Sequence, residues 1–269
     1  MRGASRTSLG VVTEDVRPVL EGARGTGLAE GLFGVVDLLD GSGPLRRALT
    51  DPARTADERV GLADRLLAGR VDGDVLDVVR RLVGGRWSAT RDLADAAEQL
   101  AVVAAVSGSS EDGGEGRLEE ELFRVERLLA SDRGLRAAVA DKHAPDASRT
   151  ALVDRLLADR VAPGTLLLVR RATTRSRGLT PERALSSYGE LAATWRRRVV
   201  ALVTTATPLR DDQRERLAAA LTRQYGRPVH VDSAVDPTVV GGVRVEVDGT
   251  LVDGSVSTRL EDTRRRLVG

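Results

Sequence analysis

The stretch Val235-Asp-Pro-Thr-Val-Val-Gly-Gly-Val-Arg-Val-Glu-Val-Asp-Gly-Thr-Leu-Val-Asp-Gly-Ser255 decides the fold of the C-terminal third of the chain. From Val243 to Val247, valines alternate with charged residues, which predicts a strand with one buried and one solvated face. Asp248-Gly249 is a turn sequence typical of a hairpin, and residues 250–252 supply the returning strand. We therefore predict a β-hairpin at this point in the chain.

Further elements of a small α/β domain flank this hairpin. Residues 198–205 are rich in β-branched side chains and predict a strand, and Val229–Val231 predict a second, short one. Between them, Asp211–Tyr225 form an amphipathic helical pattern that ends at a glycine and a proline. Ser255 suits the cap of a final helix. Residues 199–269 are thus expected to form a small mixed sheet with two helices.

The first two thirds of the chain contain an internal repeat. Gly31–Leu39 matches Glu121–Leu129, and Ala63–Val71 matches Val153–Val161, each at an offset of 90 residues. The alternative is that similar Leu, Ala and Arg composition produces chance matches, but a constant offset without gaps argues against it. Because a period of 90 is too long for a solenoid repeat, we predict a duplicated helical bundle.

The predicted fold is therefore mainly α with a small α/β domain. In the second copy, apolar residues from Leu118 to Leu129 follow a helical period, as in a bundle. We place the first bundle at 1–106, a Gly/Ser/acidic linker at 107–116 and the second bundle at 117–198. The linker falls where the second copy should carry its first helix. Either that helix is missing, or the helix predicted over residues 92–106 serves both bundles.

Composition excludes several classes of protein. Arginine and lysine number 41 against 40 acids, so the net charge of +1 does not indicate nucleic acid as the main partner. The chain has no cysteine, hence no disulfide and no cysteine-ligated zinc. The longest apolar runs fall far short of the roughly 20 residues that span a bilayer, so no direct membrane insertion is expected. The absence of isoleucine and asparagine, with Lys142 as the single lysine, indicates a GC-rich bacterial genome.

No pattern in the sequence supports catalysis, a cofactor or a metal. Gly241-Gly242 precedes a strand rather than a helix, so a bulge or close backbone contact is favoured over a phosphate loop. The two histidines, His143 and His230, have no motif spacing to a serine and form no ligand cluster. An enzyme is accordingly the least favoured class.

The Val235–Ser255 stretch resembles the C-terminal domain of the delta subunit of F-type ATP synthases, the family of the oligomycin-sensitivity-conferring protein. That family has an Asp-Pro, an aliphatic-Gly-Gly, an alternating strand and an Asp-Gly-Ser before its last helix. Those places are held here by Asp236, Pro237, Val240, Gly241, Gly242, Val243, Val245, Asp253, Gly254, Ser255 and Leu260. The resemblance is strongest over 199–269 and weakest over 1–106. The family has a single six-helix bundle before this domain, and the duplication accounts for the extra length.

The resemblance implies a non-catalytic stator subunit. Its helical bundle would bind amphipathic N-terminal helices of alpha subunits, and its C-terminal domain would bind the b subunit of the peripheral stalk. One copy would then be held at the cytoplasmic face of the membrane through the complex, as a peripheral protein. Such a subunit couples rotation to ATP synthesis.

The resemblance also implies where the partners bind. In the family, the alpha helix lies between the first and fifth helices of the bundle, which here predicts a groove lined by Val12, Val16, Val19, Val75, Val78 and Leu82. The same residues could instead fill the bundle core. For the b subunit we predict the last helix and the adjacent sheet, with Val240, Val243, Val245, Val256 and Leu260, most of which must also build the domain's core. A free-standing helical adaptor that binds amphipathic helices is the alternative function.

Overall fold

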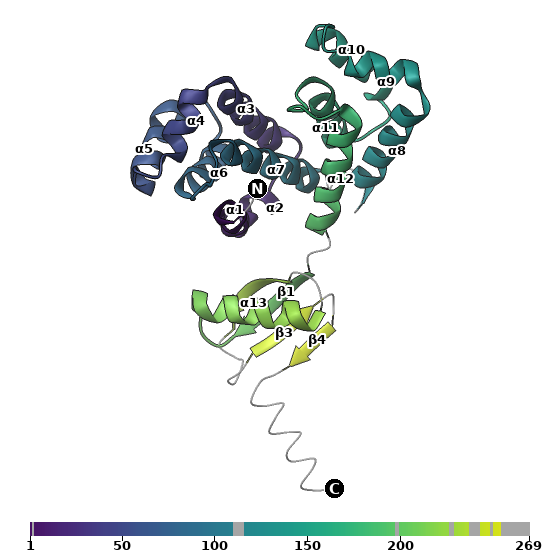
Figure 1. Ribbon diagram of the computed structural model, residues 1–269. Coiled ribbons are helices and arrows are strands. Elements are labelled where there is room, and N and C mark those ends of the chain that lie inside the picture. Colours follow the sequence, from purple (N-terminus) through teal and green to yellow (C-terminus); the bar gives the residue numbers. More distant parts are fainter. Residues whose placement is uncertain are drawn as a thin grey trace, which may run out of the picture. The chain divides into compact units, whose positions relative to one another are not determined.

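The computed structural model describes Met1 and residues 3–109, 116–196, 199–225, 229–236, 243–247 and 250–253. The chain forms two compact units, Met1–Ala193 and Thr194–Gly269. The first unit is helical and the second combines a sheet with a helix (Figure 1). This confirms the predicted fold class, mainly α with a small α/β domain.

The first bundle contains seven helices in the described residues. They are α1 (Ala4–Asp15), α2 (Arg17–Glu21), α3 (Gly27–Gly41), α4 (Gly43–Thr50), α5 (Ala56–Leu67), α6 (Gly73–Gly84) and α7 (Thr90–Gly108). Polar side-chain caps mark where two of them begin. Thr55 and Glu58 form a reciprocal capping box at α5, and Ser42 accepts the Leu45 N–H at α4.

The second bundle repeats the first element by element. Its helices are α8 (Arg117–Ser131), α9 (Arg133–Ala140), α10 (Asp146–Leu157), α11 (Pro163–Thr174) and α12 (Pro181–Arg196). Helices α8 to α11 begin and end 90 residues after α3 to α6, without exception. The repeat found in the sequence is therefore also a structural repeat.

Equivalent side chains make equivalent bonds in the two copies. Arg59 on α5 is buried and donates through Nε to the carbonyl oxygen of Val83 at 2.8 Å. Its counterpart Arg149 on α10 donates to the carbonyl oxygen of Thr173 at 2.5 Å. The arginine–aspartate bonds that tie the fifth helix of each copy to the preceding one are Arg80–Asp64 at 2.8 Å and Arg170–Asp154 at 2.6 Å. In each copy these bonds fix α5 on α6, or α10 on α11.

Helix α7 belongs to both bundles. It packs against α2, α3, α4 and α6 of the first copy and against α11 of the second. Every residue from Leu100 to Val106 is buried, so the C-terminal half of this helix is apolar on all sides, as expected for a segment covered from every direction. Near its end, a Cβ on Gly164 of α11 would lie 2.0 Å from the Ser109 Oγ. Of the two alternatives for the missing first helix, the structure thus shows the shared one.

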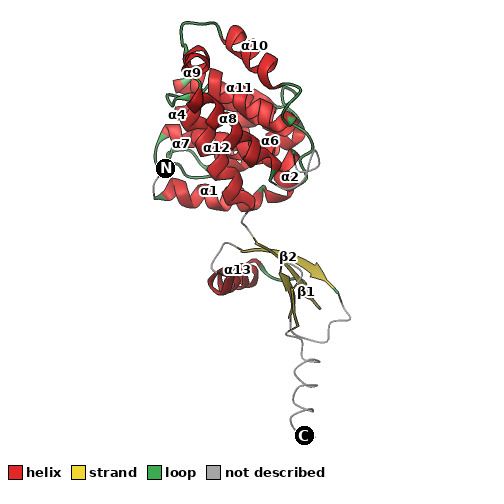
Figure 2. Cartoon of the chain, turned by 90° about the vertical axis from the view of Figure 1, so that its right-hand side faces the viewer, coloured by secondary structure: helices red, strands yellow, loops and turns green. Residues whose placement is uncertain are grey.

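The second unit contains a four-stranded sheet. Its strands are β1 (Val199–Thr205), β2 (Val229–Val235), β3 (Val243–Val247) and β4 (Thr250–Asp253), in the order β2-β1-β3-β4. Strand β1 is parallel to β2 and antiparallel to β3, and β3–β4 is the predicted hairpin. Helix α13 (Asp211–Tyr225) crosses between β1 and β2 and lies on one face of the sheet (Figure 2). The core comprises Val203, Leu221, Val229, Val231 and Val245.

Several residues of the predicted family pattern lie outside the described part of the chain. These are Pro237, Val240, Gly241, Gly242, Gly254, Ser255, Val256 and Leu260, together with the final helix expected from Ser255. Asp236 follows β2, and its backbone N–H donates to the Thr205 carbonyl oxygen at 2.9 Å. Asp253 ends β4 and Val243 begins β3.

Candidate functional site

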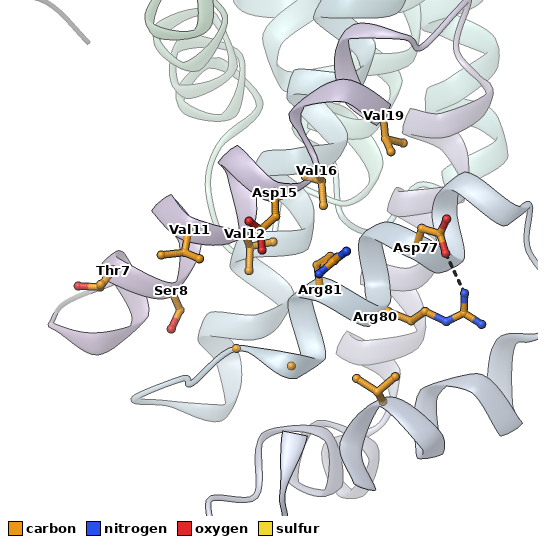
Figure 3. A pocket seen from close by; sticks show the side chains of 13 residues that line it. Thr7, Ser8, Val11, Val12, Asp15, Val16, Val19, Asp77, Arg80 and Arg81 are labelled. Carbon is orange, nitrogen blue, oxygen red and sulfur yellow. Dashed lines mark hydrogen bonds and ion pairs between the residues drawn. The ribbon is translucent and has the colours of Figure 1, made fainter. Parts of the chain in front are cut away.

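A groove of about 770 Å³ runs between α1–α2 on one side and α6 on the other (Figure 3). Gly85, just after α6, brings the two sides together at one end, because a Cβ there would lie 3.5 Å from the Ser8 Cβ of α1. Val60 of α5 also lines the hollow. These are the first and fifth major helices of the bundle, if the short α2 is counted with α1.

The α1–α2 wall of the groove carries four valines beside the polar side chains of Thr7, Ser8 and Asp15. Val12 and Val16 are 4% and 2% exposed, so they anchor α1 to the bundle while still lining the groove. Val19 is half-buried, and Val11 is 57% exposed. Val11 is thus an exposed apolar side chain next to Val12, Val16 and Val19, which border the hollow. A second apolar face that docked here would bury it.

The α6 wall is charged. Arg80 donates to Asp77 and to Asp64 at 2.8 Å each, so its guanidinium is engaged within the bundle. Arg81 is exposed and lines the groove, and within the described residues it makes no hydrogen bond or ion pair. The groove thus combines valines and Asp15 on one wall with Asp77, Arg80 and the unengaged Arg81 on the other.

The predicted site residues divide between groove and core. Val12, Val16 and Val19 line the groove, as expected of residues at a docking surface. Val75, Val78 and Leu82 are at most 1% exposed and lie in the bundle interior, and none of the three lines this groove. That any of the six binds a partner remains a prediction.

Sequence reasoning missed Val11, Arg80 and Arg81. Val11 adjoins Val12 and breaks the one-face pattern of α1, which is a detectable irregularity. The arginines flank the apolar stripe of α6, and only the packing of α1 beside α6 shows that this flank faces a hollow.

The second bundle has the same surface, but α3 of the first bundle lies over it. The groove residues of α5, α6 and the following turn, counted 90 positions on, are Thr150, Leu167, Arg170, Arg171, Thr174 and Arg175. All six line a smaller hollow of about 390 Å³ whose opposite wall is formed by Glu30, Phe33, Gly34 and Asp37 of α3.

Two side chains of α3 engage Arg171 at this surface. The guanidinium carbon of Arg171 lies 4.8 Å from the centroid of the Phe33 ring, a cation–π arrangement. One of its terminal nitrogens lies 2.6 Å from an Asp37 carboxylate oxygen. Arg171 is 6% exposed and Phe33 4% exposed, so the cation–π contact is closed to solvent, whereas the Asp37 side chain is 46% exposed.

A second charged cluster joins the two bundles through Arg177. This residue donates to Asp40 of α3 at 2.6 Å and to Glu98 of α7 at 2.9 Å, and it pairs with Asp95 at 2.7 Å. Burial alone would lower the pKa of Arg177, but these carboxylates raise it above its usual value. The Tyr188 hydroxyl also donates to Glu98 at 3.1 Å, and its burial, with that negative charge, raises its pKa.

Two other features, a metal site and a membrane-spanning helix, are absent from the described residues. No group of three or more His, Cys, Asp or Glu side chains there could hold a metal ion. None of the helices described combines the length and apolar character needed to cross a bilayer.

Comparison with known proteins identifies the family. The family model described as the ATP synthase delta (OSCP) subunit matches residues 102–267. The chain belongs to this family. The match begins inside α7, which agrees with α7 serving as the first helix of the second bundle. The first bundle lies almost entirely before it.

Relatives of the chain share its full length. The chain is 48% identical to the ATP synthase subunit delta of Kineococcus radiotolerans, over 99% of this chain and 98% of that one. It is 46% identical to that of Beutenbergia cavernae and 40% identical to that of Thermobifida fusca, each over 100% of both chains. These relatives come from GC-rich Actinobacteria, as the residue usage predicts. The delta family is a structural, non-catalytic one within ATP synthase.

Proposed function

We propose that this chain is the non-catalytic peripheral-stalk subunit of an F-type ATP synthase. It links the N-termini of alpha subunits on the catalytic head to the b subunit, so that the head is held against the torque of rotation. Membership of the delta family supports the stalk role, and the groove between α1 and α6 supports binding of a helix. One copy would be held at the cytoplasmic face of the membrane through the complex.

The observation that carries the alpha assignment is the difference between the two bundles. In the first, the surface between α1 and α6 is open and Val11 is exposed. In the second, α3 already covers the equivalent surface. Recognition of an amphipathic helix in a groove requires apolar side chains left uncovered between two helices. We therefore assign the alpha N-terminal helix to the first bundle.

The b subunit is assigned to the second unit. Val245 is 7% exposed and packs in the core of that unit, so it supports the sheet rather than offering itself to a partner. Val235, at the end of β2, is 49% exposed. The sheet around Val243 and the segment after Asp253 remain our proposed b surface.

Isothermal titration of a synthetic alpha N-terminal peptide into the full chain tests the alpha assignment. Val11→Asp places a charge among the valines of the groove and should weaken binding about 10-fold or more, since one desolvated charge outweighs a buried valine. Leu128→Asp is the matched control, because Leu128 of α8 is also exposed, at 42%, and lies outside the groove. Equal losses in the two variants, or no binding to the wild type, would overturn the assignment.

Removal of residues 199–269 tests the division of labour. The truncated chain should lose binding to the soluble part of the b subunit and keep binding to the alpha peptide. Loss of alpha binding instead would contradict it. Recovery of the full chain alone, with no ATP synthase subunits in the membrane fraction, would favour the adaptor function.

A further inference from the structure

The second bundle contains an internal example of how a helix docks on the groove surface. Arg81 and Arg171 occupy the same place in the repeat, at the same turn of α6 and α11, 90 residues apart. Each lines the hollow beside its helix. What differs is the occupant, because Arg171 is covered by α3 while Arg81 is exposed to solvent.

The contact made by α3 has a simple geometry. Phe33 and Asp37 are four residues apart on one helix, so their side chains lie on the same face, one turn apart. The Phe33 ring stacks on the guanidinium of Arg171, and the Asp37 carboxylate pairs with its edge. An arginine suits this because its planar group can stack and pair at once, which a lysine ammonium cannot do.

The first-bundle groove offers the same arginine without those partners. The neighbouring Arg80 is held by Asp64 and Asp77, as Arg170 is held by Asp154, so this bond is common to both copies. Arg81 differs from its counterpart in its partners, for it makes no ion pair within the described residues, whereas Arg171 pairs with Asp37. A guanidinium beside exposed valine is complementary to a helix with an apolar or aromatic residue and an acid.

We infer that the helix bound between α1 and α6 carries an aromatic residue and, one turn later, an acidic residue, and that Arg81 recognises this pair as Arg171 recognises Phe33 and Asp37. This rests on the proposed function for the groove and adds the chemistry of the partner. Val11 and Val19 receive the rest of the apolar face of the partner helix. The second bundle takes no external helix at this surface, because α3 occupies it.

The test uses the full chain and the synthetic alpha N-terminal peptide, with affinity measured by titration calorimetry. Arg81→Glu should weaken binding about 10-fold or more, and Arg81→Lys should weaken it less, because charge is kept and stacking is lost. Arg155→Glu is the matched control and should leave the affinity unchanged. Arg155 is an exposed arginine on α10, away from the groove. Circular dichroism of each variant verifies that the helices are intact.

Peptide variants complete the test. When each acid of the peptide is replaced in turn by lysine, one replacement should restore binding to the Arg81→Glu chain. Replacing the aromatic residue four positions earlier by alanine should weaken binding to the wild type and have little further effect on Arg81→Glu. If the wild type binds the peptide and Arg81→Glu binds it equally, the inference is wrong while the groove assignment stands. If the wild type does not bind at all, the groove assignment itself fails.

Discussion

The two bundles have equivalent helices, and the surface on the outer side of α6 and of α11 is where they differ most. In the second bundle that surface is largely covered, since α7 packs on α11 and α3 lies over the outer side, leaving only a smaller hollow. In the first it is an open groove. The difference arises from the order of the copies. Only the second follows another copy in the chain, and that first copy supplies the α7 and α3 that pack on it. Duplication has thus left the groove of one copy uncovered, while α3 and α7 cover the equivalent surface of the other.

The largest expected effect concerns the two phenylalanines of the repeat. Phe33 is 4% exposed beneath Arg171, whereas its counterpart Phe123 is 57% exposed on α8. Phe33→Ala should lower the free energy of unfolding by about 3–5 kcal/mol, and Phe123→Ala should change it by about 0.5 kcal/mol or less. Urea unfolding followed by circular dichroism measures both. Similar losses would mean that α3 does not hold the two copies together.

A smaller effect is expected where α7 meets α11. Gly164→Val places a side chain against the Ser109 Oγ and the Ala105 carbonyl oxygen, which a Cβ would approach to 2.0 and 3.0 Å. Such overpacking costs about 3 kcal/mol. At the same place in the first copy stands Asp74, which is exposed, so Asp74→Val should cost less than about 1 kcal/mol. Equal unfolding midpoints for the two variants would show that the α7–α11 contact is loose.

Sequence patterns were sufficient for the repeat, the hairpin and the class of fold. The offset of 90 residues predicts four helix pairs because the same apolar spacing and the same Arg–Asp bonds recur. The role of α7 could not be decided in this way, since an alanine- and valine-rich helix is compatible with one neighbour or with several. The different surroundings of Arg81 and Arg171 could not be predicted either, because their local sequences are alike and only the neighbouring α3 distinguishes them.

The smallest expected effect is a pH dependence of stability that arises in the second copy and not in the first. Gly31 of α3 packs on Val75, where a Cβ would lie 2.5 Å from the valine Cγ2. Their counterparts are Glu121 and Thr165, and the Glu121 carboxylate accepts hydrogen bonds from the Thr165 hydroxyl at 2.6 Å and the Ala162 N–H at 2.9 Å. The first copy therefore joins these helices by an apolar contact, and the second by a buried carboxylate.

Burial by itself would raise the pKa of Glu121, but these hydrogen bonds, together with Arg117, lower it below the usual value. A carboxyl with a lowered pKa in the folded state contributes stability above its unfolded pKa, about 4.3, and loses it as the pH falls through the folded value. Glu121→Gln should therefore cost about 1–2 kcal/mol at pH 7, and the difference from wild type should shrink below about pH 4.

The double variant Glu121→Gly, Thr165→Val imports the pair of the first copy and serves as the control for this titration. It removes the carboxylate together with the hydroxyl that bonds it, so it should cost less than the sum of the two single variants, because each single change leaves a buried polar group without its partner. The difference between its stability and that of the wild type should also shrink as the pH falls below about 4, because the wild type then loses the Glu121 contribution that the variant lacks at every pH. A difference between wild type and Glu121→Gln that stays constant from pH 7 to pH 3 would show that the carboxylate does not stabilise the second bundle in its charged form.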